Sequence, residues 1–361
     1  MKVTCALLSG FIVLLLTSFY QAKGDRTILR TASGSAITIV EMDGFLKTYM
    51  DSFGLPGLSI AIINDSKLVY HRTPGVVNME TKHEVTDKTL FDAGSLTKTP
   101  FTFLVMKMVD QGVLELDKPL YTYLPYADIA HDERYKLITA RMVLSHTTGF
   151  PNWRFQNKEP ILDIKFTPGT KVSYSGEGFV YLAKVIAHLK NMHVKGLEQL
   201  FQEEVAKPLR MKNAYFSWND YIATHRASGH VDGKVAEGWG INASKPDFNP
   251  AHSLQTEAVS YARFLIGMIE GKGLKKETHE EMLRVQNPGK FDSTDVAWCL
   301  GLESRDSPYG RIYAHSGSNW NFTSNYFFIR DKKFGYVFFT NSDKAFKFNQ
   351  KLEDFLTSKK L

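Results

Sequence analysis

Cysteine is almost missing from this chain, which holds only Cys5 and Cys299 among its 361 residues. Cys5 falls inside an apolar N-terminal run that we expect to be a leader, so the rest of the chain cannot form an internal disulfide. Cys299 lies in an apolar, strand-like run. A buried thiol without a chemical role is the expected state there.

Several functional motifs are missing as well. The sequence has no His-Glu-x-x-His, no clustered Cys/His spacing and no phosphate-cradling glycine loop. It also lacks the Gly-x-Ser-x-Gly that places a serine on a sharp strand-to-helix turn. We therefore expect neither a metal nor a cofactor.

Positive charge is in excess but is not concentrated. The formal net charge is +6 and the pI is near 9.0, yet we find no cluster of lysine and arginine. A nucleic-acid partner is therefore not expected. The mildly cationic surface is compatible with anionic substrates or with association with the cell envelope. The hydrophobic content of 43% is enough for one large domain or two closely joined ones.

No hydrophobic run is long enough to favour a stable membrane span. The longest apolar run, from Ala6 to Tyr20, follows Lys2 and is typical of a signal peptide. We predict a signal peptide over residues 1–22 and export, either to the periplasm or out of the cell. Tyr20 fits poorly three residues before a cut at Ala22, which leaves an uncleaved membrane anchor open.

Apolar periodicity predicts strands near both ends of the chain and helices between them. Helices are expected over residues 37–53, 97–109, 179–189, 197–205, 259–269 and 344–356, and strands over residues 58–70 (two), 297–303, 311–315, 322–329 and 336–340. The fold class predicted is α/β (α+β), with one antiparallel sheet built from both terminal segments and flanked by the terminal helices. Residues 23–94 and 285–361 would form this α/β subdomain, and residues 95–284 a large, mostly helical insert.

Ser95 and Lys98 form the only Ser-x-x-Lys of the chain. Pro100 is tolerated only near a helix start, so the helix must begin near Ser95, with Lys98 on the same face. A serine hydroxyl needs a base to attack a carbonyl, and lysine qualifies if its pKa is depressed towards neutrality. For an isolated motif the commoner interpretation is a helix cap with a solvated lysine.

Two further motifs follow in chain order: Tyr174-Ser-Gly176 before an apolar helix, and His315-Ser316-Gly317-Ser318 at the end of a strand. Together with Ser95-x-x-Lys98 they resemble the serine beta-lactamase-related family, which includes class C beta-lactamases, DD-carboxypeptidases and esterases. The segments 55–59, 138–149 and 338–341 extend the resemblance over nearly all of the chain after the leader.

The resemblance implies a penicillin-binding-protein-like (beta-lactamase/transpeptidase-like) fold and a covalent acyl-enzyme on Ser95. Lys98 and Tyr174 would remove the Ser95 proton, and the backbone N–H groups of Ser95 and Ser318 would hold the oxyanion. The partner would be a small molecule or peptide with an amide or ester carbonyl. His146 is then expected to be structural, since the base of such a site is lysine or tyrosine.

Two departures from the family pattern bear on the substrate. Gly176 stands where the family commonly has asparagine, so an amide that would bind a substrate acylamide is absent. His315, Ser316 and Gly317 replace the common Lys-Thr-Gly, and His315 would bind an anionic group or relay a proton. Trp153, with Phe155, is a candidate for the substrate cleft or for packing. We rank a peptidase or esterase above a beta-lactamase. A beta-lactamase and a non-catalytic penicillin-binding-like sensor or scaffold remain as alternatives.

Overall fold

A seven-stranded antiparallel sheet is the centre of the fold in the computed structural model, which describes residues 28–236, 247–287 and 296–360. In spatial order its strands are β10 (Ala297–Trp298), β11 (Glu303–Arg305), β12 (Ile312–Ser318), β13 (Thr323–Ile329), β14 (Phe334–Thr340), β3 (Leu58–Asn64) and β4 (Lys67–Arg72). The C-terminal strand β14 pairs directly with the N-terminal strand β3. The predicted sheet built from both ends of the chain is therefore confirmed.

The remaining strands form small sheets. They are β1 (Ile28–Arg30) with β2 (Ala36–Thr38), β5 (Phe91–Asp92) with β9 (Gln255–Thr256) and β6 (Ala214–Tyr215), and β7 (His230–Val231) with β8 (Lys234–Val235). The helices are α1 (Ile39–Phe53), α2 (Lys98–Asp110), α3 (Ala140–Leu144), α4 (Gly176–Leu189), α5 (Leu197–Phe201), α6 (Asp220–His225), α7 (Ala258–Glu270), α8 (Lys276–Leu283) and α9 (Ala345–Ser358). Within the described ranges, no helix combines the length and the apolar character that a bilayer span requires. The predicted leader lies outside the described residues.

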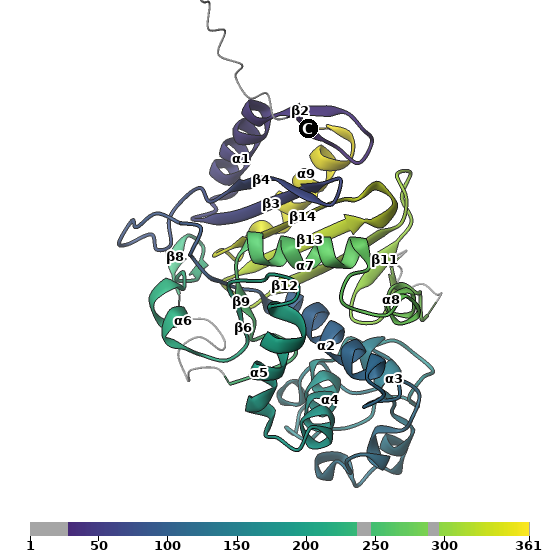
Figure 1. Ribbon diagram of the computed structural model, residues 1–361. Helices are drawn as coiled ribbons and strands as arrows, with labels where there is room; N and C mark the ends of the chain where they lie inside the picture. The colour runs from purple at the N-terminus through teal and green to yellow at the C-terminus, as the bar shows by residue number, and fades with distance from the viewer. Residues whose placement is uncertain (1–27, 237–246, 288–295, 361) are drawn as a thin grey trace, which may run out of the picture.

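Helices cover both faces of the sheet, which is why the central strands β14 and β3 are buried along their whole length. Successive residues of a strand point to opposite faces. Ile60 and Ile62 of β3 lie in the core with α1 and α9, whereas Ala61 and Ile63 lie in the core with α7. Figure 1 shows α7 lying across the sheet and α1 beside α9 at one end of the molecule. The subdomain boundaries at residues 95 and 285 stay a prediction.

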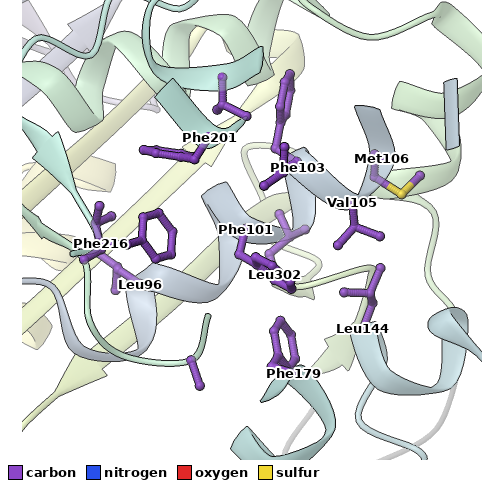
Figure 2. Close-up of a cluster of buried hydrophobic side chains, with 14 of the residues drawn as sticks. Leu96, Phe101, Phe103, Val105, Met106, Leu144, Phe179, Phe201, Phe216 and Leu302 are labelled. Atoms are coloured by element: carbon purple, nitrogen blue, oxygen red, sulfur yellow. The ribbon is translucent and has the colours of Figure 1, made fainter. Parts of the chain in front are cut away.

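The helical region is built around α2, which leads away from the sheet (Figure 1). Phe101, Phe103 and Leu104 are fully buried, and Phe179 of α4 and Phe201 of α5 belong to the same core. Figure 2 shows these aromatic side chains gathered along α2. Because α2 is buried on nearly all sides, it holds the turn that carries Ser95 in a fixed position.

One predicted strand is interrupted. Residues 297–303 form β10 and β11 separated by a turn at Gly301, whose φ is 74°. A Cβ at Gly301 would lie only 1.9 Å from Thr102 Oγ1, and the Gly301 carbonyl accepts a hydrogen bond from Thr99 Oγ1 at 3.0 Å. The close approach of α2 therefore forces the turn, which the local apolar pattern does not reveal.

Candidate active site

Ser95 lies in the 3₁₀ turn Gly94–Thr97, between β5 and the first residue of α2. Thr97 Oγ1 closes this turn by donating to the Gly94 carbonyl at 2.5 Å. Pro100 sits in the first turn of α2, where its missing N–H costs nothing. Ala93 occupies the N-cap position of the 3₁₀ turn and Thr97 that of α2, and neither side chain makes a capping hydrogen bond. Ser95 therefore does not serve as a helix cap.

Lys98 is fully buried and its Nζ lies 3.3 Å from Ser95 Oγ. Nζ also donates to the Ala251 carbonyl at 2.9 Å. Burial lowers the pKa of Lys98 from 10.5 to about 7, and no acidic side chain among the described residues opposes the shift. The Tyr174 ring, 4.6 Å from Nζ, favours the charged form, but desolvation outweighs this attraction. A neutral amine at this distance can accept the Ser95 proton.

Tyr174 faces both Ser95 and Lys98. Its ring keeps some contact with solvent, but its hydroxyl is buried and makes no standard hydrogen bond within the described part of the chain. Burial raises the pKa of the phenol, and only the nearby Ser95 hydroxyl acts to lower it. Tyr174 is therefore a neutral phenol near pH 7, beside the Ser95 hydroxyl.

His146 holds the segment that carries Tyr174. Its carbonyl accepts the Ser173 N–H at 2.8 Å, and its Nδ1 accepts the Ser175 N–H at 3.1 Å. Its ring lies 4.4 Å from the Tyr174 ring. Burial holds the pKa of His146 well below 6.5, so the ring is neutral. These contacts give His146 a structural place in the site.

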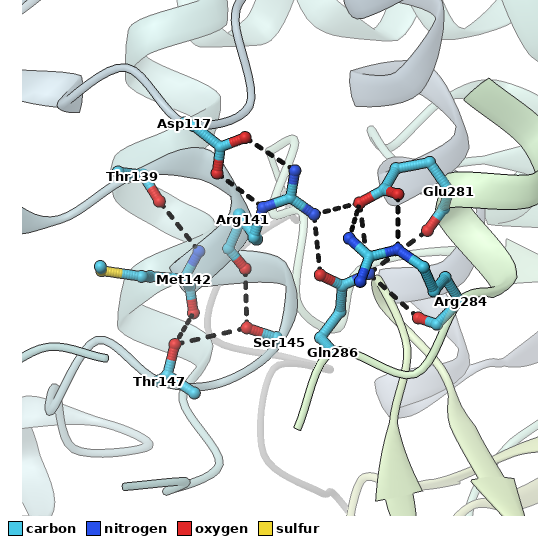
Figure 3. A network of polar contacts seen from close by, with 9 residues as sticks. All are labelled: Asp117, Thr139, Arg141, Met142, Ser145, Thr147, Glu281, Arg284 and Gln286. Carbon is cyan, nitrogen blue, oxygen red and sulfur yellow. Dashed lines mark hydrogen bonds and ion pairs between the residues drawn. The ribbon is translucent and has the colours of Figure 1, made fainter. Parts of the chain in front are cut away.

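A polar network fixes the segment on which His146 stands. The Arg141 guanidinium bridges Asp117 to Glu281 and also donates to Gln286 Oε1 at 2.7 Å (Figure 3). Thr139 caps α3 through a hydrogen bond from the Met142 N–H at 3.2 Å. The 138–149 segment is thereby tied both to the preceding loop and to α8.

Strand β12 passes unusually close to the serine turn. A Cβ at Gly94 would lie 2.8 Å from Ser318 N, and a Cβ at Gly317 would lie 2.3 Å from the Ala93 carbonyl oxygen and 3.1 Å from Ser95 N. Both positions must therefore be glycine. Because neither glycine has a side chain, β12 can approach the serine turn closely, and Ser95 and Ser318 line the same cavity.

Asp92 joins the serine turn to the loop after β12, a role that its position in the motif did not reveal. Its Oδ1 accepts the Gly94 N–H at 2.9 Å and the Asn319 Nδ2–H at 2.6 Å, and Arg226 lies 3.6 Å away as its ion-pair partner. Burial raises the pKa of Asp92, while Arg226 and the hydrogen bonds lower it. The carboxylate holds the two segments that carry the Ser95 and Ser318 nitrogens.

His315 does not belong to the described lining of the cavity above the serine. It is buried, its Nδ1–H donates to the Ser316 carbonyl at 2.7 Å, and its ring lies 6.2 Å from that of Tyr174. Burial, together with the charge of Lys98, lowers its pKa to about 3. A neutral imidazole offers no positive charge to an anion, and among the described residues its Nε2 makes no hydrogen bond that a proton relay could use. The Ser316 side chain is exposed at the neighbouring strand position.

A cavity of about 220 Å³ opens above the serine. Its described lining consists of Ser95, Lys98, Asn152, Trp153, Phe155, Gln156, His252, Ser318, Asn319 and Trp320. This cavity thus brings together four residues that the sequence analysis named as site candidates: Ser95, Lys98, Trp153 and Ser318. Tyr174 and His315 are not among these lining residues, although the Tyr174 ring lies 4.6 Å from Lys98 Nζ, and Gly176 lies under the Trp153 ring.

Five members of this lining were not identified from the sequence, because single residues in loops carry no periodic signal: Asn152, Gln156, His252, Asn319 and Trp320. A larger hollow of about 530 Å³ lies between α1 and β4, but it contains none of the candidate residues. Chemistry, rather than size, marks the smaller cavity as the candidate active site.

The chain matches the family model described as Beta-lactamase over residues 42–358. It is 20% identical to Protein flp of Staphylococcus aureus over 329 residues, which cover 85% of this chain and 64% of that protein. It is 27% identical to a beta-lactamase of Providencia stuartii over 248 residues, 66% of this chain and 62% of that protein. The chain thus spans less than two thirds of the length of these relatives.

Two solved structures have the same fold. The octameric penicillin-binding protein homologue from Pyrococcus abyssi superposes with a TM-score of 0.71 at 21% identity, covering 88% of this chain and 78% of that one. The D-alanine carboxypeptidase AmpC from Burkholderia cenocepacia also gives a TM-score of 0.71, at 20% identity, covering 87% and 97%. At this identity the likeness establishes the fold alone.

Proposed function

Because the chain belongs to the beta-lactamase family, we propose that it is a serine hydrolase that forms an acyl-enzyme on Ser95. The proposed substrate is an amide or ester, handled with peptidase-like or esterase-like specificity. The observation that carries the proposal is the buried Lys98, whose Nζ lies 3.3 Å from Ser95 Oγ and whose pKa of about 7 leaves much of it neutral at physiological pH.

In the first step, neutral Lys98 accepts the proton of Ser95 Oγ as that oxygen bonds to the substrate carbonyl carbon. The carbonyl oxygen takes the displaced electron pair and becomes an oxyanion. The backbone N–H groups of Ser95 and Ser318 donate to it, each stabilising the transition state by about 3 kcal/mol. The contact of 3.3 Å is slightly long for a hydrogen bond and is expected to shorten when substrate is bound.

In the second step, the oxyanion collapses and the bond to the leaving group breaks. Tyr174 is a neutral phenol, so it can donate its proton to the leaving oxygen or nitrogen while protonated Lys98 replaces that proton. Water then attacks the acyl-enzyme through the same groups in reverse. The product acid leaves and Ser95 regains its proton.

The specificity follows from what the site lacks. Gly176 offers no side-chain amide for a substrate acylamide, and neutral His315 offers no cation for a substrate carboxylate. Both groups occur in penicillin-like compounds. An N-acylated D-Ala-D-Ala peptide carries both groups as well, so these two features favour the esterase over the beta-lactamase and do not by themselves favour the peptidase.

The test compares three substrates at equal enzyme concentration: a short-chain nitrophenyl ester, a D-Ala-D-Ala peptide and nitrocefin. We expect kcat/KM for the ester or the peptide to exceed that for nitrocefin, and Ser95→Ala to abolish all turnover. Nitrocefin turnover equal to or above the others would overturn the ranking. A protein that binds these compounds without Ser95-dependent turnover would instead be the non-catalytic sensor or scaffold.

We propose further that the chain is exported, on the basis of Lys2 and the apolar run that follows it. N-terminal sequencing of the protein recovered from outside the cytoplasm should begin just after Ala22 or Gly24. An intact leader on membrane-associated protein would instead support the uncleaved anchor.

A further inference from the structure

The indole of Trp153 lies directly on Gly176. A Cβ at Gly176 would come within 2.7 Å of two indole carbons, much closer than the separation of about 3.5–4 Å at which carbon atoms pack. Gly176 is the first residue of α4, and its φ is not in the left-handed region. The glycine is therefore required by the indole and not by its own backbone.

The loop that carries Trp153 is fastened to the start of α4 on both sides of the indole. On one side, Asn152 Oδ1 accepts the Gly176 N–H at 3.0 Å. On the other, the Arg154 guanidinium pairs with Glu177, whose Oε1 also accepts the Arg154 backbone N–H at 2.9 Å. With both neighbours held, the indole stays over Gly176.

Aromatic side chains continue this wall around the cavity. The Phe155 ring stacks on Trp153 at 7° with centroids 6.1 Å apart, and the His252 ring meets Trp153 edge-on at 5.5 Å. Trp320, 73% exposed, lies on the lining as well. Burial and the nearby Lys98 hold the pKa of His252 well below its usual value, so the ring is uncharged near pH 7.

The cavity is small as well as aromatic. Its volume of about 220 Å³ is below the range of about 300–1,000 Å³ that pockets for drug-sized ligands occupy. An indole fills the space where a side chain at position 176 would stand, so a branch on the carbon next to the substrate carbonyl has no room there. Flat or unbranched apolar groups can pack on the same surface.

We propose that Trp153 determines the acyl specificity, so that the site takes esters of small unbranched or aromatic carboxylic acids and rejects acyl groups that carry an α-acylamido branch. This inference rests on the proposed serine hydrolase function. It names a substrate class for the site, which the catalytic residues alone do not distinguish.

The first experiment holds the leaving group constant and varies the acyl group. The p-nitrophenyl esters of butyric acid and of N-acetyl-D-alanine are compared, and the acyl preference is the ratio of their kcat/KM values. We expect a ratio above 10 in favour of butyrate for the parent protein. Trp153→Ala should lower this ratio at least tenfold, because it removes the packing surface and opens space for the branch.

A matched control separates the position of Trp153 from the general loss of a large side chain. Trp218, also half-buried, does not belong to the cavity lining. Trp218→Ala should leave the acyl preference within about twofold of the parent value.

A double-mutant cycle tests the contact itself. Gly176→Ala should lower kcat/KM for butyrate at least tenfold when Trp153 is present, because its Cβ displaces the indole. In the Trp153→Ala background, the same change should alter kcat/KM less than twofold. Equal effects of Gly176→Ala in both backgrounds would overturn the inference.

The proposed function and this inference fail in different ways. If a fluorophosphonate does not label Ser95, the serine hydrolase proposal itself is wrong. If Ser95 is labelled but the acyl preference favours N-acetyl-D-alanine, or changes less than tenfold in Trp153→Ala, then the catalytic proposal stands and the role of Trp153 is refuted.

Discussion

Replacement of Lys98 by methionine should stabilise the folded protein while it abolishes catalysis. Methionine has a similar length and carries no charge, so it can occupy the fully buried position of Lys98 without desolvating an ammonium group. The prediction follows from the pKa of Lys98, which burial lowers from 10.5 to about 7.

The magnitude depends on pH in a defined way. Between pH 7 and pH 10.5 the unfolded chain binds more protons at Lys98 than the folded protein does, so the stability of the parent rises with pH. By the linkage relation, burial of Lys98 lowers the free energy of unfolding by about 5 kcal/mol at pH 6 and by about 2 kcal/mol at pH 9. Lys98→Met also loses the hydrogen bond to the Ala251 carbonyl, which offsets about 1–3 kcal/mol of the stability that the variant gains.

Urea unfolding at several pH values between 6 and 9 measures this difference. Lys98→Met should be more stable than the parent by about 2–4 kcal/mol at pH 6, and the advantage should shrink by about 3 kcal/mol by pH 9. Lys347→Met is the matched control, since Lys347 is exposed on α9, and its effect should not change with pH. A stability difference for Lys98→Met that is constant over this range would refute the assignment of a depressed pKa to Lys98.

Three further outcomes are expected. The value of kcat/KM for an ester should fall about tenfold per pH unit below an apparent pKa near 7, because protonated Lys98 cannot accept the Ser95 proton; a flat profile from pH 5 to 8 would contradict this. Gly317→Ala should lower kcat about 100-fold or more with little change in KM, since its Cβ would push Ser318 N away from Ser95 N; a thermal melt checks that the variant is folded. Asp92→Ala should lower the free energy of unfolding by about 3–5 kcal/mol, because it leaves Arg226 buried without its partner, and a loss below 1 kcal/mol in urea unfolding would show that the pair is not structural.

The sequence could predict the architecture because its strongest signals are local and periodic. The predicted helix over 37–53 is observed as Ile39–Phe53, and the predicted two strands over 58–70 are β3 and β4. The pairing of β14 with β3 follows once both ends of the chain are read as strands of one sheet. The two-residue strands β5, β9 and β6 are too short to leave a periodic pattern.

The parts of the site that escaped prediction depend on tertiary contacts. Nothing local distinguishes Asp92 from an ordinary acidic residue until Asn319 and Arg226 are brought to it from distant segments. The protonation state of His315 could not be predicted from the sequence either, because only burial beside Lys98 lowers its pKa enough to make it neutral. Gly176 was recognised as a departure from the family pattern, but only the structure shows that the Trp153 indole occupies the space beside it.

Mapping of a fluorophosphonate adduct tests the central claim most directly. After reaction at pH 8, the intact mass should increase by one adduct per chain, and peptide sequencing should place it on Ser95. Ser95→Ala should take up none, and Lys98→Met, although folded, should be labelled at least 100-fold more slowly. An adduct on another residue, or equal labelling of the parent and Ser95→Ala, would contradict the account of Ser95 as a nucleophile activated by Lys98.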